Sequence, residues 1–566
     1  MREIIYGFIV TFSVVVTLQS CHVLYLTMYT YNRPPSESGA PEHFQPPRLS
    51  FTVMLPARHE EPVIGTTIGR VARANYPPGL LQILVVCAAD DEGTIAKAEE
   101  KIRELGRLGA RNISMVVFHD GPINKPHGLN AALAHADKDI VTIFDAEDDV
   151  HPEVFNLVNT VMVNEQVKVV QAGVQLMNFD SSWWSALNIL EYFFWFRSRL
   201  HYHARSGATP LGGNTVFFDR NVITGLGGWD EHNLTEDADI GLRLSAAGEK
   251  IRIVYDHRYV TKEETPPTIR QFVKQRTRWS QGFMQTLKKG TWRDLPTRKQ
   301  RFLAFYTLFF PQVQAFLGIY IPVSLLDMFF LKTPVLIAMV SFLPVVTLFC
   351  NYLIYAVGIY QFANNYGLKC SPDIILKMFF GWLPYQLLVS FASIRATLRQ
   401  LRGISNWEKT KHIGAHREPA HDRAGQLGEA TSRVALFQAA ADKRAQQGAR
   451  EGAQQGASEG AQHAAREGVQ QGARERGAGE RAADARAGAR LARDSHAGRP
   501  GPVPGQRQVT GPRRPDCPGL RAAQRADYAW LAPVPVPPVQ HGRGDIRRAR
   551  VVGDQGGPAE PDYIFL

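Results

Sequence analysis

Residues 140–149 read IVTIFDAEDD, an apolar and β-branched run followed at once by a cluster of carboxylates. Such a run is typical of a buried strand. Similar runs lie at Phe51–Leu55, Ile83–Cys87 and Ser114–Phe118, and they alternate with stretches of helical periodicity at Ile64–Ala74, Thr94–Leu108 and His127–Ala136. This alternation predicts an α/β domain in which a parallel sheet carries helices on both faces.

Polar motifs follow three of these predicted strands. Parallel sheets bind ligands beyond the carboxyl ends of their strands, and here Glu60 follows the first run, Asp90-Asp91 the second and Asp145 the fourth. Asp90 and Asp91 can hydrogen-bond the base or ribose of a nucleotide; the alternative is that they cap a helix from Thr94. There is no GxGxxG and no GxxxxGK[ST] motif, so a dinucleotide or P-loop site lacks support.

The carboxylates after the fourth run are candidates for a metal site. Clustered carboxylates repel one another, and a divalent cation bound to phosphate oxygens would neutralise them. Because Asp145, Glu147, Asp148 and Asp149 offer only hard oxygen ligands, we expect Mg²⁺ or Mn²⁺. The alternative is a solvated acidic turn that caps a helix from Pro152, a role that fits Asp148 and Asp149.

Lys125 and Asp237 are further candidate site residues, the first for phosphate binding and the second for proton transfer. Lys125 lies in NKPHGLNAAL before a helix N-terminus, where it could meet a phosphate; an ordinary surface lysine is the alternative. Asp237 is the last residue of a TED motif and stands at the start of another predicted helix. We predict that Asp237 is a general base, whereas Thr235 and Glu236 fit helix capping.

The motif QRTRW lies on a predicted helix at Thr268–Lys288. Gln275, Arg278 and Trp279 are spaced i, i+3 and i+4, so they share one face of that helix. An arginine can hold a diphosphate through two hydrogen bonds, and an indole can stack on a sugar ring. The alternative is a basic amphipathic helix on a membrane surface. The position after an acidic motif and before apolar segments favours a binding site.

Apolar segments long enough to cross a membrane bracket this domain. The first, within residues 1–31, is expected to be a retained transmembrane helix, because it is too long for a usual signal peptide. The later three are Phe302–Leu331, Val335–Phe362 and Ile374–Ser393. With a cytosolic domain, three crossings would put the basic cluster at Arg395–Lys411 outside, against the positive-inside rule. We therefore expect Phe302–Leu331 or Ile374–Ser393 to be interfacial or re-entrant.

Composition and net charge indicate which kinds of partner and site this chain can have. Its 566 residues carry a net charge of +11, and no nucleic-acid module is visible, so anionic membrane lipids are the simpler partner. Five scattered cysteines without a CxxC pair argue against a disulfide framework or a zinc site. From about Glu418, small and polar residues dominate around an imperfect octad that begins QQGAREGA at Gln446. Such a segment cannot bury a core, and we predict that it is disordered.

These features predict the organisation of the whole chain. The expected parts are an N-terminal transmembrane helix (1–31), a linker (32–48), a cytosolic domain (49–300), a membrane block (301–400), a basic juxtamembrane motif (401–417) and a disordered tail (418–566). The protein is thus expected to be a multi-pass protein of the inner or plasma membrane, with its catalytic domain in the cytoplasm.

Taken in order, the motifs resemble those of the family-2 glycosyltransferases, in the membrane-embedded processive branch that includes cellulose, hyaluronan and chitin synthases. The resemblance covers about residues 49–414 and is most specific at LGGNTVFF, GGWDEHNLTEDADIGLRL, QRTRW and NWEKTKHIG. It implies an A-type nucleotide-sugar-binding α/β domain with a divalent metal. It also implies inverting transfer from a nucleoside-diphosphate sugar to a polysaccharide acceptor. A UDP-sugar is the donor that we expect before any other.

The resemblance also implies roles for single residues. Donor binding would fall to Glu60, Asp90, Asp91, Lys125 and Asp145, metal binding to Asp145 and Glu147, proton removal from the acceptor to Asp237, and binding of the diphosphate and the acceptor sugar to Gln275, Arg278 and Trp279. The chain departs from the family pattern at three points. In place of the usual Asp-x-Asp motif, the third position is Glu147 with Asp148 next, and either could complete the metal site, with Glu147 favoured by register. PARHE replaces Pro-x-Tyr-Asn-Glu, and Asp90-Asp91 lacks the following glycine. These departures leave the donor sugar open.

Three functions are compatible with these motifs. Processive polysaccharide synthesis, with export along the adjoining spans, is the first. Transfer of a single sugar to a lipid such as a polyprenyl phosphate is the second, and a catalytically silent membrane scaffold is the third. The QRTRW helix favours the first because it offers a place for an acceptor sugar, and the intact carboxylates together with Arg278 oppose the third.

Overall fold

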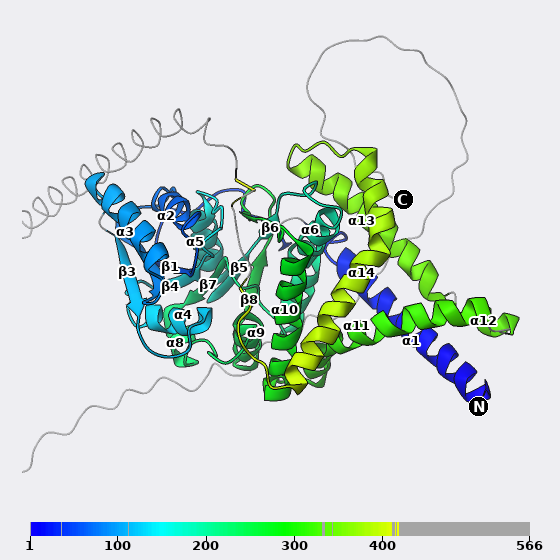
Figure 1. The fold of residues 1–566 in the computed structure, drawn as a ribbon. Helices are drawn as coiled ribbons and strands as arrows, with labels where there is room; N and C mark the ends of the chain where they lie inside the picture. Colours follow the sequence, from blue (N-terminus) through cyan, green and yellow to red (C-terminus); the bar gives the residue numbers. More distant parts are fainter. Residues whose placement is uncertain are drawn as a thin grey trace, which may run out of the picture. The chain divides into compact units, whose positions relative to one another are not determined.

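A computed structural model describes residues 2–34, 37–110, 112–330, 334–341, 343–409, 414 and 416–417. A seven-stranded sheet in this part has the order β3-β2-β1-β4-β7-β5-β8 (Figure 1). Its strands are β1 (Phe51–Ala57), β2 (Leu81–Ala88), β3 (Ile113–Phe118), β4 (Ile140–Ile143), β5 (Val169–Ala172), β7 (Val216–Asp219) and β8 (Ile251–Val254). β6 (Val174–Leu176) and β9 (Thr261–Glu263) form a separate parallel pair. The tail predicted at 418–566 lies outside the described residues.

The four predicted strands are confirmed as β1 to β4, and their pairings are parallel. β7 departs from the prediction, since it runs antiparallel to β4 and β5. After β5 the chain passes through α6 (Ser185–Phe194), the π-helical turn η3 (Trp195–Arg199) and α7 (Leu200–Ser206). It then enters β7 at Val216, opposite the carboxyl ends of β4 and β5. Entry from that end makes the sheet mainly, not wholly, parallel.

Two hydrophobic cores cover the two faces of the sheet, because successive side chains of a strand point to opposite faces. Phe51, Val53 and Leu55 of β1 pack with α2 (Ile64–Ala72), α3 (Glu92–Arg107) and α5 (Val154–Glu165). Met54 packs on the other side with α4 (Lys125–Leu133) and α9 (Glu236–Ala246). The predicted helices are confirmed as α2, α3 and α4. The small helix α8 (Arg220–Gly225) follows β7.

The helix that carries QRTRW is α10 (Ile269–Lys289). It begins after Thr268, whose side chain accepts a hydrogen bond from the backbone N–H of Gln271 at 3.3 Å. It ends at Gly290, where φ is +86°, a conformation that glycine adopts without strain. α10 packs against α9, α11 (Arg298–Phe330) and α14 (Pro372–Leu401). One face of α10 is buried in this packing, and the membrane-surface alternative for this helix stays a prediction.

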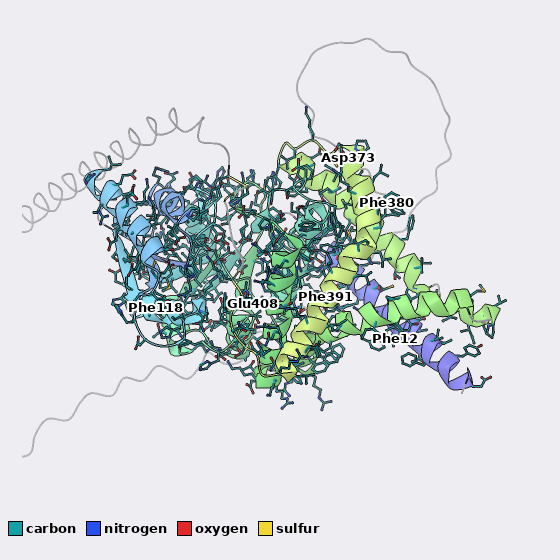
Figure 2. All side chains as sticks on the ribbon, viewed as in Figure 1. Phe12, Phe118, Asp373, Phe380, Phe391 and Glu408 are labelled. Carbon is teal, nitrogen blue, oxygen red and sulfur yellow. The ribbon has the colours of Figure 1, made fainter. Side chains whose placement is uncertain are left out.

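Within the described residues, four helical segments are long and apolar enough to cross a membrane, which agrees with the four segments expected. They are Tyr6–Met28 in α1 (Arg2–Met28), Arg298–Tyr320 in α11, Val335–Asn365 over α12 (Val335–Ser341) and α13 (Leu343–Asn365), and Pro372–Leu401, which is α14. Large apolar side chains of these helices are exposed, among them Phe380 and Phe391 on α14 (Figure 2). That exposure suits a lipid environment. An interfacial or re-entrant place for α11 or α14 stays a prediction.

Hydrogen bonds join the end of α1 to η3. The hydroxyl of Thr30 donates to the carbonyl of Arg197 at 3.0 Å, and the backbone N–H of Thr30 donates to Ser198 Oγ at 3.2 Å. The Arg199 guanidinium donates to Thr27 Oγ1 at 2.9 Å. These bonds hold the N-terminal apolar helix against the α/β domain.

Candidate active site

A cavity of about 1050 Å³ opens beyond the carboxyl ends of β1 and β4. All but two of the predicted site residues line it, namely Glu60, Lys125, Asp145, Glu147, Asp237, Gln275, Arg278 and Trp279. Asp90 and Asp91 are not part of its lining. Residues far apart in the sequence therefore meet in one place.

Asp145, directly after the β4 run, forms an ion pair with Lys125 at the start of α4. Lys125 Nζ lies 2.5 Å from Asp145 Oδ1 and donates to the carbonyl of Gly213 at 2.8 Å. Burial alone would lower the pKa of Lys125, but the charges of Asp145, Glu236 and Asp237 outweigh it and raise that pKa above its ordinary value. Lys125 is therefore a fixed positive charge between the strand-end carboxylates and the TED motif.

The acidic cluster after β4 divides into residues of the cavity and residues of the interior. Asp145 and Glu147 line the cavity, whereas Asp148 is fully buried. Asp148 Oδ2 accepts the backbone N–H of Asp145 at 2.8 Å, and the amide of Asn214 donates to both Asp148 oxygens. Burial raises the pKa of Asp148, and the nearby charges of Glu263, Asp145 and Glu147 raise it further. Asp148 thus braces the backbone of Asp145, and Glu147 faces the cavity.

Asp149 also has a structural partner. Its carboxylate pairs with Arg70 of α2, and its backbone forms a β-bridge with Lys262. α5 begins at Val154 after Glu153 in the N-cap position. The helix-capping alternative for Asp148 and Asp149 is therefore wrong.

Asp90 and Asp91 differ in what they offer to a ligand. Asp90 is half exposed and is held by Arg58, whose two terminal nitrogens lie 2.7 Å and 3.0 Å from its oxygens. Asp91 is buried and caps α3: it accepts the backbone N–H of Thr94 at 3.4 Å and that of His59 at 2.6 Å. Asp91 thus has the capping role that was the alternative. Arg58 lines the cavity, so Asp90 stands at its rim.

His59, Glu61 and Asp91 form a group of metal-type ligands in the described part of the chain, with ligand atoms within 4.8 Å of one another. His59 and Glu61 are exposed, and Asp91 is engaged in capping. Asp145 and Glu147 do not belong to this group or to another of three in that part. A cation at Asp145 and Glu147 would therefore need further oxygen ligands, from water, from other groups of the chain or from a substrate.

The TED motif opens α9, with Thr235 in the N-cap position but without a capping bond from its side chain. Asp237 Oδ1 accepts the backbone N–H of Ala238 at 2.8 Å. Burial raises the pKa of Glu236 and of Asp237, and Lys125 and Arg278 offset only part of that rise. A Cβ at Gly213 would lie 3.2 Å from Asp237 Oδ2, so the glycine lets the LGGN backbone approach this carboxylate.

On α10, Arg278 points to the cavity with few partners. Its Nη1 donates to the carbonyl of Leu234 at 3.5 Å, and its guanidinium carbon lies 4.5 Å from the centre of the Trp407 ring. Within the described residues, its buried Nε has no hydrogen-bond partner. The guanidinium is thus held by stacking on Trp407 and by one long hydrogen bond.

Trp279 packs on its neighbour in the motif. Its ring lies 4.8 Å from the guanidinium carbon of Arg276 and 6.1 Å from the ring of Tyr192. Arg276 in turn donates to Asn188 at 2.5 Å and pairs with Glu191. The side chain of Arg276 therefore orients Trp279, a role that the sequence analysis did not assign.

The segment after α14 also reaches the cavity, through Trp407 and Lys409. Lys409 Nζ lies 2.8 Å from Glu60 Oε1. Glu408, labelled in Figure 2, accepts two hydrogen bonds of 2.7 Å from Arg395 of α14. NWEKTKHIG contributes to the family resemblance, but no role was predicted for its single residues. An aromatic residue beside opposite charges after the last apolar segment was the available signal.

Residues 46–282 match the family described as "Glycosyltransferase like family 2". This chain carries a family-2 glycosyltransferase domain. The prediction of a glycosyltransferase is therefore confirmed, and the mainly parallel α/β sheet agrees with the predicted A-type fold.

Relatives of this glycosyltransferase extend beyond the domain. The probable glycosyltransferase YdaM of Bacillus subtilis is 25% identical over 390 residues, covering 66% of this chain and 88% of that protein. Poly-beta-1,6-N-acetyl-D-glucosamine synthase of Staphylococcus epidermidis is 23% identical over 385 residues, with 65% and 88% covered. Beta-monoglucosyldiacylglycerol synthase of a Nostoc species is 25% identical over 260 residues, with 43% and 52% covered.

Among solved structures, a mannosyltransferase of Pyrobaculum calidifontis in complex with GDP-Man and Mn²⁺ is similar to this glycosyltransferase. Its TM-score is 0.44 at 18% identity, and the match covers 70% of this chain and 99% of that one.

Proposed function

We propose that this glycosyltransferase performs inverting, processive transfer of a sugar from a nucleoside-diphosphate sugar to a growing polysaccharide. Among the possible donors, we propose a UDP-sugar. The reaction takes place at the cytoplasmic face of a membrane. One observation carries the proposal. The cavity that holds Asp145 and Asp237 continues past Arg278 and Trp279 to residues of the apolar helices α1, α11 and α14.

The donor set at the end of β4 fits a hard divalent cation. Asp145 and Glu147 offer carboxylate oxygens to the cavity, as Mg²⁺ and Mn²⁺ prefer. Asp148 supports this set from behind, through its bond to the backbone N–H of Asp145. The contact between Lys125 and Asp145 fits the same electrostatics, since a positive charge is stabilised at this point. A bound metal would neutralise charge on the leaving diphosphate.

Arg278 and Lys125 act on the leaving group. The bond between the anomeric carbon and the diphosphate oxygen breaks, and its electron pair stays on the diphosphate. Preformed donors placed where that charge develops lower the barrier, and they are strongest in a site with little water. Arg278 lines the cavity, and a guanidinium can bind a diphosphate with paired hydrogen bonds. Gln275 lines the same wall and adds an amide.

Asp237 acts on the acceptor. The acceptor hydroxyl attacks the anomeric carbon from the face opposite the diphosphate, which inverts the configuration. Its proton passes to the ionised carboxylate of Asp237. Burial raises the pKa of Asp237 above that of an exposed aspartate, which makes the ionised form a stronger base.

The membrane part of the cavity suits a hydroxyl-rich chain. Among its lining residues are Gln19 of α1, Gln314 of α11, and Gln386 and Ser390 of α14. Gln314 is buried and donates to Ser390 Oγ at 2.9 Å. Polar side chains inside apolar helices are costly unless they face a partner or a polar path. Amides and hydroxyls along this wall support export of the product between the helices.

A second function, transfer of one sugar to a lipid acceptor, has an observation of its own. The same part of the cavity is also lined by Ile9 and Val16 of α1 and by Leu317 of α11. Such a wall fits an acyl or prenyl chain, and the Nostoc relative is named as a synthase of a glucosylated diacylglycerol.

The test is to incubate the full chain in detergent with Mn²⁺ and a panel of radiolabelled nucleotide sugars. Release of nucleoside diphosphate together with a polymer ladder on a gel is the expected result. A single lipid-extractable product would replace the first function by the second. No release from any donor of the panel would overturn both.

A further inference from the structure

We infer that the second half of α10 is a positioning device that sets the separation between Arg278 and the TED carboxylates. Four of its residues, Gly282, Gln285, Thr286 and Lys289, contact the segment 230–239, and we call them the α10 ladder. The inference rests on the proposed function, because it concerns how the two sides of that site are held together.

The ladder begins one turn after Arg278, with a close approach of backbones. A Cβ at Gly282 would lie 2.6 Å from the backbone nitrogen of Thr235 and 2.5 Å from its Oγ1. The backbone nitrogen cannot rotate away as the end of a flexible side chain could. Thr235 immediately precedes Glu236 and Asp237. Glycine therefore allows α10 to pack directly on the residue that opens the TED helix.

The next two residues bind the loop that leads into the motif. Gln285 Oε1 accepts the backbone N–H of Leu234 at 2.9 Å. Thr286 Oγ1 accepts the side-chain amide of Asn233 at 2.8 Å, and both of these side chains are buried. Leu234 is also the residue whose carbonyl accepts from Arg278. The loop is thus fixed by the same helix that carries the cation.

The last residue closes the ladder with charge. Lys289 Nζ lies 2.7 Å from Asp230 Oδ2 and 2.9 Å from Asp239 Oδ2. Asp239 is fully buried and stands two residues after Asp237, and its second partner is Arg243 at 2.9 Å. Without Lys289, a buried carboxylate would keep only one of its two cations. Such a loss leaves the charge of a buried carboxylate less fully compensated and so weakens the local arrangement.

The four ladder residues are spaced i, i+3, i+4 and i+7, so they lie along one side of α10. They lie outside the donor-binding and proton-accepting groups proposed above and act through Asp237, as positioning residues. A misplacement of about 1 Å between reacting groups can lower a rate roughly a hundredfold. A shift of α9 against α10 would therefore reduce turnover without removing any group that binds the donor.

The experiment compares Lys289→Met, Lys289→Arg and Gly282→Ala with the full-length parent in detergent. Gly65→Ala in α2 is the matched control, since the atom nearest to a Cβ there is 3.9 Å away. Three quantities are measured: kcat and KM for the nucleotide sugar, affinity for UDP, and amide hydrogen exchange of the 230–240 segment. If Gly282→Ala does not fold, Gln285→Ala takes its place, because it removes the acceptor of the Leu234 N–H.

We expect Gly282→Ala and Lys289→Met to lower kcat roughly tenfold to a hundredfold. UDP affinity should stay at the parent value, and exchange in the 230–240 segment should become faster. Lys289→Arg should restore kcat and protection, and Gly65→Ala should match the parent. Unchanged protection in Lys289→Met, or a fall in kcat matched by the fall in UDP affinity, would overturn the inference. A parent that consumes no nucleotide sugar would overturn the proposed function instead, while the exchange arm would still test the ladder.

Discussion

The two sides of the cavity differ in how their charged groups are held before a substrate binds. On the strand-end side, charges are paired within the protein: Arg58 with Asp90, and Lys125 with Asp145. On the α10 side, Arg278 makes one hydrogen bond of 3.5 Å in the described part of the chain and is otherwise held by stacking on Trp407.

This difference has a physical consequence. A ligand that reaches the strand-end side must exchange existing partners, so loss of one residue leaves another charge unpaired. A ligand that reaches Arg278 meets a donor that packing has oriented. Substitutions on the first side should therefore disturb chemistry and local structure together, and those on the second should affect donor binding and the reaction barrier with less change in local structure.

The largest effect is expected at Asp145, on the side of paired charges. Asp145→Asn should lower metal-dependent release of nucleoside diphosphate about a thousandfold or more, because a catalytic metal supplies several kcal/mol and about 1.4 kcal/mol is a factor of ten. Asp149→Asn is the control and should be mild, since Asp149 pairs with Arg70 instead of lining the cavity. The measurement is diphosphate release with Mn²⁺. Undiminished turnover in excess chelator would contradict the metal assignment.

A smaller but still large effect is expected at Asp237. Asp237→Asn keeps the size of the side chain and a hydrogen-bond acceptor for the Ala238 N–H, but it cannot take a proton. Transfer should fall by roughly a hundredfold or more, and UDP affinity should persist. If Asp237 only stabilises the start of α9, the melting temperature should fall, by a loss of about 1 kcal/mol, while turnover of the folded fraction stays near the parent rate. Turnover and UDP affinity measured in one preparation decide between these outcomes.

On the α10 side, Trp407→Ala should weaken UDP binding roughly threefold to thirtyfold, because a cation–π contact contributes about 0.5–2 kcal/mol. Trp407→Phe keeps an aromatic face under Arg278 and should lose less. The check is UDP titration by calorimetry. Equal loss in both variants would show that the indole acts in another way than by stacking.

The smallest effect is a shift in pH dependence. Only ionised Asp237 can accept the proton, and burial raises its pKa, so turnover should fall as the pH drops through a value above the ordinary aspartate range. The charge of Lys125 lowers that pKa. Lys125→Gln should therefore move the acidic limb of the kcat profile to higher pH. An acidic limb that moves to lower pH, or stays in place, would exclude this electrostatic coupling.

Site residues could be predicted where a local sequence pattern marks them, and not where their role depends on partners distant in the chain. Asp145 could be placed because a strand ends where it stands, and Arg278 because helical spacing groups it with Gln275 and Trp279. Asp148 could not be separated from Asp145 by pattern, since its neighbour Asn214 comes from a loop distant in the chain. The stacking of Arg278 on Trp407 could not be predicted either, because Trp407 lies after the last apolar helix, far from Arg278 in the sequence.

The same distinction between local patterns and distant contacts applies to the fold. The strands β1 to β4 and the helices between them follow from local periodicity, because burial on both faces demands apolar runs of strand length. The antiparallel course of β7 depends on where the chain re-enters the sheet after α6 and α7, which no local pattern records.

The sequence by itself thus determined the α/β class, the order of the chemical motifs and the apolar helices. Each of these depends on local composition or on a hydrophobic periodicity of a few residues. Only the tertiary structure decided which carboxylates face the cavity, which cations they meet and how α10 is held against the TED segment. The physical reason is that burial and ion pairing depend on residues brought together from distant parts of the chain. In this glycosyltransferase, Lys289 of α10 lies 2.9 Å from Asp239 of α9, although the strands β8 and β9 separate the two helices in the sequence.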